Sequence, residues 1–190
     1  MIRPITHIGN PVLRQVCDAV DPGDVASPVI QGLINDLVDT KRHANGAGIA
    51  APQIGVALRV FIVEVHNNPR YPYKPEVPLD VVINPEITFL TDDRYENFEG
   101  CLSIPGLRAR VPRCPHIRVT GLSRDGAPFS KEERGITAGT YQHEFDHVNG
   151  VLFPDRVQDT SSYCTWEEFH ARYEEGFRDE VASIVGRWGA

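Results

Sequence analysis

The sequence lacks any long apolar run and any N-terminal leader pattern. No stretch of its 190 residues approaches the roughly 20 consecutive apolar residues that a membrane-spanning helix needs. The segment Met1–Gly9 has no apolar core of the kind found in a secretory signal. We therefore expect no membrane partner and no secretion.

Cysteines are few and widely spaced. The four of them stand at positions 17, 101, 114 and 164, and no two form a C-x-x-C pair. This spacing argues against a disulfide framework and against a four-thiolate zinc site. It favours a reducing compartment, which we take to be the cytoplasm.

An excess of basic residues is also missing. The formal net charge is −7, which argues against broad binding to phosphate backbones and therefore against DNA as a partner. With 41% hydrophobic and 24% charged residues, the composition is that of an ordinary globular protein. We find no repeat, low-complexity tract or linker, so residues 1–190 are expected to form one domain.

Three segments have helical patterns. The first begins at Ser27–Pro28, a cap followed by a first-turn proline, and ends near Asn45–Gly46. Its apolar positions recur at three- and four-residue spacing and are Val29, Ile30, Leu33, Leu37 and Val38. The second is expected over 138–149, closed by Gly150, and its small early residues indicate a helix held by close packing. The third follows a capping box at 165–168 and carries a stripe of Trp166, Phe169, Tyr173, Phe177, Val181, Ile184 and Trp188.

The middle of the chain has the composition of strands. Segments 58–65, 81–90 and 117–123 are rich in β-branched and aromatic residues, and Asp125–Gly126 is typical of a hairpin turn. A helix, then strands, then two helices predict an α+β fold with helices packed on antiparallel or mixed sheets.

Residues 142–147, Gln-His-Glu-Phe-Asp-His, contain the pattern H-E-x-x-H. On a helix, positions four apart lie on one face, so His143 and His147 can converge on one metal ion. Glu144 can then act as general base. This motif alone predicts a metal hydrolase, although the pattern also arises by chance.

A catalytic site needs a third protein ligand. Downstream, His170 lies on the amphipathic last helix and is better explained as a solvated or interface histidine, while Asp155 and Glu167 have no supporting context. Cys101 follows a glycine that lets the backbone approach closely, and a thiolate is a strong ligand. The alternative for Cys101 is a buried free cysteine.

Three segments, in this order, make the chain resemble the peptide deformylases. They are Gly46-Ala-Gly-Ile-Ala-Ala-Pro-Gln53, Glu99-Gly-Cys-Leu-Ser103 and Gln142-His-Glu-Phe-Asp-His147. The resemblance extends from about residue 5 to about residue 156. It implies sheets packed around a central helix that carries H-E-x-x-H, a long N-terminal helix, and a variable amphipathic helix over 160–190.

The resemblance also implies roles for individual residues. Cys101, His143 and His147 would bind the metal, and Glu144 would be the general acid/base. The side-chain amide of Gln53 and the backbone N–H of Leu102 would stabilise an oxyanion. The residues implied in substrate binding are Gly46, Gly48, Ile49 and Arg108, and those that support the ligands are Glu99 and Arg113. For Arg108 an exposed loop position is the alternative.

The implied reaction removes the formyl group from formyl-methionine at the N-terminus of newly made polypeptides and releases formate. One divalent ion would activate water for attack on the formyl carbon, with Glu144 moving the proton. Members of this family commonly use Fe(II), and a Cys/His/His set also suits zinc, nickel or cobalt in isolated protein.

The C-terminal segment departs from the habit of those deformylases that dock on the ribosome through a basic helix. Residues 165–190 carry six acidic side chains against three arginines, which rRNA would repel. Ribosome association through this helix is therefore not expected. We expect its apolar stripe to cover the domain's own core, with a dimer contact as the alternative, so monomer and homodimer both stay open.

Two rival functions remain. A zinc peptidase would explain H-E-x-x-H but not Gln53 or the Glu99–Ser103 segment. A metal-binding protein without turnover would be favoured by substitutions at Glu144, Gln53 or Cys101, and none is substituted. Formate release from a formyl-Met peptide, with cleavage of internal peptide bonds as control, separates the three.

Overall fold

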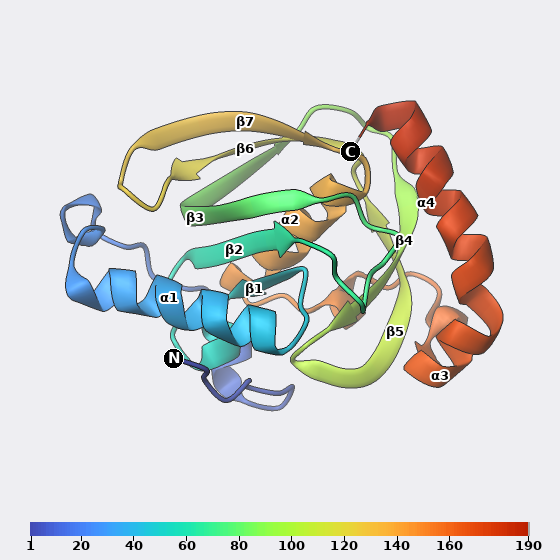
Figure 1. Ribbon diagram of the computed structural model, residues 1–190, viewed down its shortest axis with the longest axis horizontal. Helices are drawn as coiled ribbons and strands as arrows, with labels where there is room; N and C mark the ends of the chain where they lie inside the picture. The colour runs from blue at the N-terminus through green and yellow to red at the C-terminus, as the bar shows by residue number, and fades with distance from the viewer. Residues whose placement is uncertain (190) are drawn as a thin grey trace.

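Two antiparallel sheets and three long helices make up most of the computed structural model, which describes residues 1–189 (Figure 1). The strands are β1 Gly48–Ala50, β2 Val60–Val65, β3 Val77–Phe89, β4 Tyr95–Cys101, β5 Ile104–Arg113, β6 His116–Leu122, β7 Pro128–Arg134 and β8 Cys164–Thr165. The helices are α1 Pro28–His43, α2 Gly135–Val148, α3 Trp166–Glu168 and α4 Glu174–Trp188, with a π-helical turn at Phe169–Tyr173 between the last two. Short 3₁₀ turns lie at Pro11–Arg14, Pro22–Asp24, Ala51–Ile54, Phe153–Arg156 and Thr160–Ser162.

The larger sheet has the order β1-β2-β3-β6-β7, and the smaller one the order β4-β5-β8. Every pair of neighbouring strands in both sheets runs antiparallel. The predicted α+β class with antiparallel sheets and a C-terminal helix is thus confirmed. β1 is an edge strand, paired only with β2 among residues 1–189, and its residue Gly48 lines the neighbouring cavity.

Strand β2 is buried along its whole length because both of its faces are covered. Successive side chains of a strand point to opposite faces. Ile62 packs in the cluster that contains Ile34 and Leu37 of α1, whereas Phe61 packs with Tyr141 of α2. The larger sheet therefore lies between α1 and α2, as Figure 1 shows.

Helix α2 is buried at twelve of its fourteen positions. It runs from Gly135 to Val148 and so contains the expected segment 138–149 except for Asn149, which is its C-cap. Gly139 faces the Tyr95 hydroxyl so closely that a Cβ there would lie 2.3 Å from it, and this hydroxyl donates to the Gly135 carbonyl at 3.1 Å. The small residues at the start of this helix were predicted to indicate close packing. In the structure, Gly139 allows β4 to approach the helix closely.

The C-terminal segment covers the smaller sheet, and Figure 1 shows α4 running beside β4. Phe169, Phe177 and Val181 are buried in one cluster with Phe98 of β4 and Ile136 of α2. The Thr165 hydroxyl caps the segment by accepting from the Glu168 N–H at 3.2 Å. Three residues of the apolar stripe therefore cover the chain's own core, as expected, whereas Tyr173 of the same stripe is 44% exposed.

Some sequence expectations were incomplete. Val29, assigned to the apolar stripe of the first helix, is 77% exposed. Strands β4, β5 and β7 were not predicted, since buried charged residues interrupt β4 and β5, and β7 alternates between intermediate and exposed positions.

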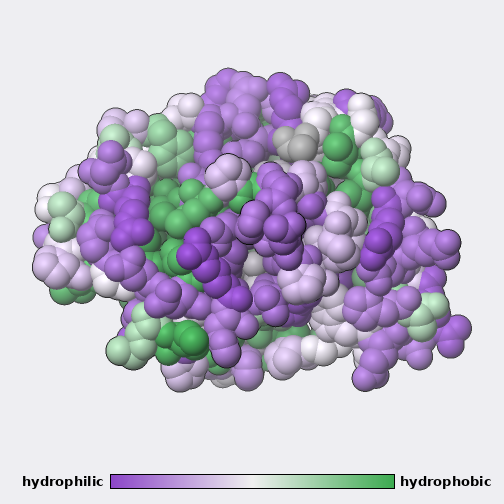
Figure 2. Space-filling view, in the orientation of Figure 1, coloured by the Kyte–Doolittle hydropathy of each residue, from purple (hydrophilic) through white to green (hydrophobic). Residues whose placement is uncertain are grey.

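Among residues 1–189, no helix is both long enough and apolar enough to cross a bilayer. The face drawn in Figure 2 is mostly hydrophilic, with a hydrophobic area where the strands of the larger sheet emerge above α1.

Replacing Phe177 with alanine is expected to lower the free energy of unfolding by about 3–5 kcal/mol, because a buried aromatic ring leaves a cavity. Urea unfolding followed by circular dichroism measures this loss. The matched control is Val29→Ala in exposed α1 surface, for which we expect a change within about 0.5 kcal/mol. Equal effects of the two substitutions would show that α4 does not pack on the core.

Candidate metal centre

The three predicted metal ligands lie close together. His143 and His147 are one turn apart on α2, with ring centroids 5.0 Å apart. Cys101 ends β4, and its Sγ lies 3.3 Å from Nε2 of His147. The potential ligand atoms of the three residues all lie within 4.8 Å of one another.

This donor set fits a divalent transition-metal ion. In a tetrahedral site with metal–sulfur and metal–nitrogen bonds of about 2.3 and 2.1 Å, the donor atoms are about 3.3 to 3.6 Å apart. A sulfur and a nitrogen at those bond lengths are about 3.6 Å apart. The Cys101 sulfur and the His147 nitrogen are 3.3 Å apart, which is close to that spacing. Two imidazoles and one thiolate leave a fourth position for water or substrate.

Glu99 orients the first histidine. Its carboxylate accepts from His143 Nδ1 at 2.8 Å, so the other ring nitrogen points toward Cys101. Burial would lower the pKa of His143, but hydrogen bonds to Cys101 and Glu99 raise it well above its usual value. Burial and the nearby His143 lower the pKa of His147 well below its usual value.

A buried arginine joins the elements that carry the ligands. Arg113, at the end of β5, donates to both oxygens of Glu99 at 2.7 and 2.9 Å and to Asp146 of α2 at 2.7 Å. Arg156 holds the other oxygen of Asp146 at 2.7 Å from the surface side. Burial opposes the ionisation of Glu99, yet Arg113 lowers the pKa of that carboxyl well below its usual range.

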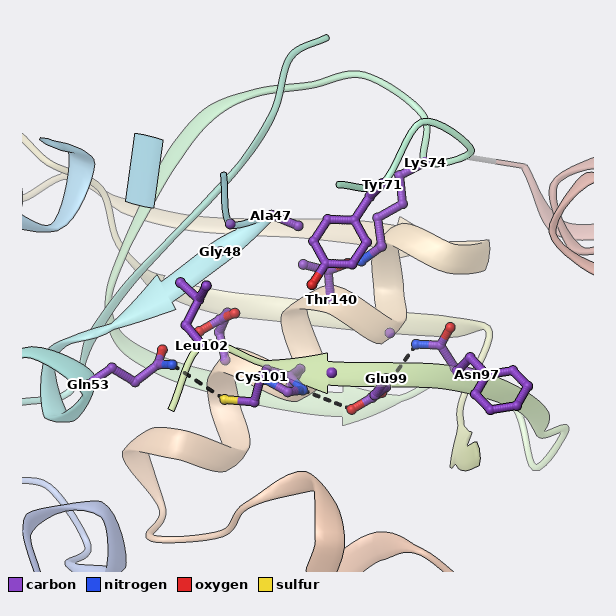
Figure 3. Close-up of a pocket in the computed structure, with 16 residues that line it drawn as sticks. Ala47, Gly48, Gln53, Tyr71, Lys74, Asn97, Glu99, Cys101, Leu102 and Thr140 are labelled. Carbon is purple, nitrogen blue, oxygen red and sulfur yellow. Dashed lines mark hydrogen bonds and ion pairs between the residues drawn. The ribbon is translucent and has the colours of Figure 1, made fainter. Parts of the chain in front are cut away.

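The amide of Gln53 is fixed beside the sulfur. Its Oε1 accepts from the Ala50 N–H at 2.8 Å, and its NH₂ group lies 3.2 Å from Ser103 Oγ. Figure 3 shows the same NH₂ group directed at Cys101 Sγ, 3.5 Å away. The Ser103 N–H also donates to the sulfur at 3.4 Å. These donors stabilise negative charge on the sulfur.

Glu144 has a buried carboxyl group that faces β1. A Cβ on Gly48 would lie 2.6 Å from its Oε1, so glycine is needed for this approach. Its Oε2 has no hydrogen-bond partner within residues 1–189. Burial raises the pKa of Glu144 to about 7.

A cavity of about 40 Å³ lies between these groups, and Gly46, Gly48 and Leu102 line it. Two predicted substrate-binding residues lie elsewhere. The side chain of Ile49 is fully buried in the cluster beside α1, so only its backbone belongs to the edge strand.

Arg108 is fully buried below the C-terminal segment. Its guanidinium carbon lies 4.2 Å from the centre of the Trp166 ring system and 3.8 Å from that of Phe169. It donates to the Phe98 carbonyl and the Tyr73 hydroxyl, while Nε and Nη1 have no partner in the described residues. The alternative of an exposed loop arginine is therefore wrong, and Arg108 does not line the cavity.

Several site residues were missed from the sequence. Asp146 stands inside the helix motif but points to Arg113, and Ser103 is the last residue of the cysteine segment. Their positions next to the motifs were the available signal. Lys74, Asn97 and Thr140 also line the cavity, and burial lowers the pKa of Lys74 to about 8. Nothing in the local sequence marked Lys74.

Comparisons with known proteins agree with this geometry. The family described as polypeptide deformylase matches residues 2–163. Peptide deformylase 1 of Nitrosomonas europaea is 44% identical over 163 residues, which cover 86% of this chain and 92% of that protein. Peptide deformylase 1 of Prochlorococcus marinus is 45% identical, with coverages of 85% and 84%.

Solved structures are similar as well. The Met-Ala-Ser-bound class I type b peptide deformylase of Acinetobacter baumannii has a TM-score of 0.80 at 35% identity, covering 83% of this chain and 99% of that one. A peptide deformylase of Legionella pneumophila has a TM-score of 0.73 at 35% identity and covers 96% and 98%.

Replacing Arg113 with methionine is expected to lower the free energy of unfolding by about 3–5 kcal/mol, because Glu99 and Asp146 would be left buried without their partner. Arg156→Met is the matched control, since Arg156 also pairs with Asp146 but is about half exposed. Urea unfolding of both variants at neutral pH tests this. Similar losses for the two arginines would contradict the assignment of the buried network to Arg113.

Proposed function

Because the chain belongs to the peptide deformylase family, whose members are enzymes, we propose that it removes the N-formyl group from formyl-methionine at the N-terminus of newly made polypeptides, releasing formate. The observation that carries this proposal is the convergence of Cys101, His143 and His147 beside Glu144. The expected partners are formylated nascent chains in the cytoplasm.

We propose that Cys101, His143 and His147 hold one divalent ion, Fe(II) in the native protein, with zinc, nickel or cobalt able to replace it after isolation. Such an ion acidifies water and polarises a carbonyl oxygen. Glu99 and Arg113 support the site by fixing the orientation of His143.

Glu144 is the proposed general acid/base. It follows His143 directly, lines the cavity, and has one carboxyl oxygen free of protein partners within residues 1–189. A carboxyl in that position can take a proton from water during attack on the formyl carbon and return it to the leaving amine. Gly48 keeps the space for it, because any side chain there would displace the carboxyl.

Gln53 and Leu102 are the proposed oxyanion donors. Gln53 presents a neutral NH₂ group next to Cys101, and its carbonyl end is already held by the Ala50 N–H. A neutral amide donor stabilises developing negative charge without repelling the ion. We assign the backbone N–H of Leu102, the residue after the cysteine, to the same task.

The edge strand β1 is the proposed docking site for the peptide backbone. Strand order leaves one side of Gly48–Ala50 without a neighbouring strand, and Gly46 and Gly48 line the cavity. An extended peptide can add there as a further strand, with Ile49 contributing main-chain groups only. We leave Arg108 out of this set, since its guanidinium is buried against the rings of Trp166 and Phe169 and does not line the cavity.

We propose further that residues 1–190 act as one catalytic domain, with α2 as its central H-E-x-x-H helix and α1 as its long N-terminal helix. The C-terminal segment carries more acidic than basic side chains, so any contact with the ribosome would use another surface.

The test of the function is formate release from a formyl-Met-Ala-Ser peptide by the metal-loaded chain. Cleavage of internal peptide bonds is the control, and it would indicate the zinc peptidase instead. Metal binding without either activity would indicate a binding protein without turnover.

Glu144→Ala is expected to retain the metal yet to lose at least about 10²-fold in kcat, because proton transfer loses its acceptor. Elemental analysis of the same sample gives the metal content. A near-normal rate in the metal-loaded variant would rule out Glu144 as the acid/base residue.

Cys101→Ala is expected to lose most of its bound metal, because two imidazoles alone do not complete the ligand set. Cys114→Ala is the matched control, since Cys114 is also fully buried but its thiol donates to the Thr91 and His116 carbonyls. Elemental analysis after anaerobic purification compares the two. Equal metal content in both variants would contradict the assigned site.

A further inference from the structure

The cavity beside the metal ligands has a polar wall. Lys74 from the loop between β2 and β3, Asn97 from β4 and Thr140 from α2 line the same space as Cys101 and Glu144. In Figure 3 the Lys74 side chain descends from its loop and ends next to Thr140, with the Tyr71 hydroxyl nearby. Three polar groups of this kind are unusual in a space that faces an apolar ligand.

Lys74 brings an ammonium group with spare donors. Its Nζ donates to Thr140 Oγ1 at 2.8 Å, and within residues 1–189 this is its only hydrogen bond. An ammonium has three N–H donors, so two remain for whatever occupies the cavity. Lys74 is partly buried, and leaving these donors without an acceptor where a ligand excludes water costs free energy.

The loop holds Lys74 in place. The Lys74 N–H donates to the Tyr71 carbonyl at 3.0 Å, and the Tyr71 N–H donates to Asn68 at 3.2 Å. Tyr71 is itself buried, with its ring centre 6.0 Å from that of Trp166. Lys74 is thus held by a hydrogen-bonded turn whose residue Tyr71 is buried.

The volume of the cavity and the charges that line it restrict which ligands it can accept. A cavity of about 40 Å³ has room for roughly three water-sized groups, which matches the end of a medium-sized side chain. A carboxylate ligand would be attracted by the Lys74 ammonium but repelled by the carboxylate of Glu144, which lines the same space. A neutral oxygen satisfies the Lys74 donors without that repulsion.

We propose that Lys74 is a specificity-determining residue, and that the cavity accepts, alongside formyl-methionine, N-formyl substrates whose first side chain ends in a neutral oxygen acceptor. Methionine sulfoxide and glutamine share this chemistry, the first arising by oxidation of methionine and the second being encoded. The inference rests on the proposed function, because a formyl group held at the metal ligands places the adjacent side chain in this cavity.

The experiment compares kcat/KM for formyl-X-Ala-Ser peptides, where X is methionine sulfoxide, glutamine or the apolar norleucine. For each protein, kcat/KM for an oxygen-bearing peptide is divided by kcat/KM for the norleucine peptide. This ratio is expected to be at least about tenfold lower in the Lys74→Met variant than in the unsubstituted chain, both loaded with metal. A ratio is used because it does not depend on metal loading. If only the ratio for the sulfoxide peptide falls, oxidised methionine supplies the oxygen that Lys74 recognises. If only the ratio for the glutamine peptide falls, the side chain of an encoded residue supplies it.

Binding gives a second readout that needs no turnover. By calorimetry, the deformylated peptide with methionine sulfoxide at its first position is expected to lose at least about fivefold in affinity in Lys74→Met, and the norleucine peptide is expected to bind equally well or better. Thr140→Val, which removes the hydroxyl that holds Nζ, should shift both readouts in the same direction.

Lys131→Met is the matched control, because it removes one positive charge that lies outside the cavity and should leave the ratios unchanged. Lys74→Met replaces a partly buried ammonium with an apolar side chain of similar length and is expected to fold. Absence of formate from every peptide would overturn the proposed function. Formate release with unchanged ratios, together with unchanged product binding, would overturn the role of Lys74.

Discussion

The ion pairs of Arg113 with Glu99 and Asp146 are the constraint on which the site depends. The three residues come from β5, β4 and α2, and each is almost completely buried. A charge withdrawn from water must be paired, so the three elements cannot shift independently without exposing one charge to an apolar interior. Because Cys101 ends β4 and His143 lies on α2, the same pairs fix the distance between the sulfur and the imidazoles.

Close backbone approach is the second requirement. α2 touches β1 at Gly48 and β4 at Gly139, where no side chain could be accommodated. These contacts place the carboxyl of Glu144 against the edge strand, and they explain why a helix with Gly, Ala and Thr in its first half is stable only inside this fold. The chemistry of the site thus depends on residues that carry no functional group.

The sequence was informative wherever a short segment carried its own geometry. The spacing of His143 and His147 predicts one face of a helix, and the structure places both beside Cys101, which the resemblance named as the third ligand. Ser27 and Thr165 capped their helices where expected.

The sequence was uninformative where position depends on tertiary packing. β4 and β5 were missed because Glu99, Arg108 and Arg113 look like surface residues until their partners are known, and all three are buried. Lys74 was missed for the same reason: only the fold of its loop brings it over α2, and no local pattern reports that. The role of Arg108 was drawn from a resemblance that ended before Trp166 and Phe169, the residues that cover it.

The contact of Arg108 with Trp166 and Phe169 has a consequence for sequence variation in related proteins. The family match ends at residue 163, yet the guanidinium of Arg108, inside the matched region, packs against two rings that lie beyond it. The C-terminal helices therefore cannot be exchanged independently of the rest of the domain. A homologue with a smaller residue at Trp166 or Phe169 would expose the buried guanidinium. A homologue with a smaller residue at Arg108 would have a cavity beside the two rings. The two sides of this contact should change together or not at all.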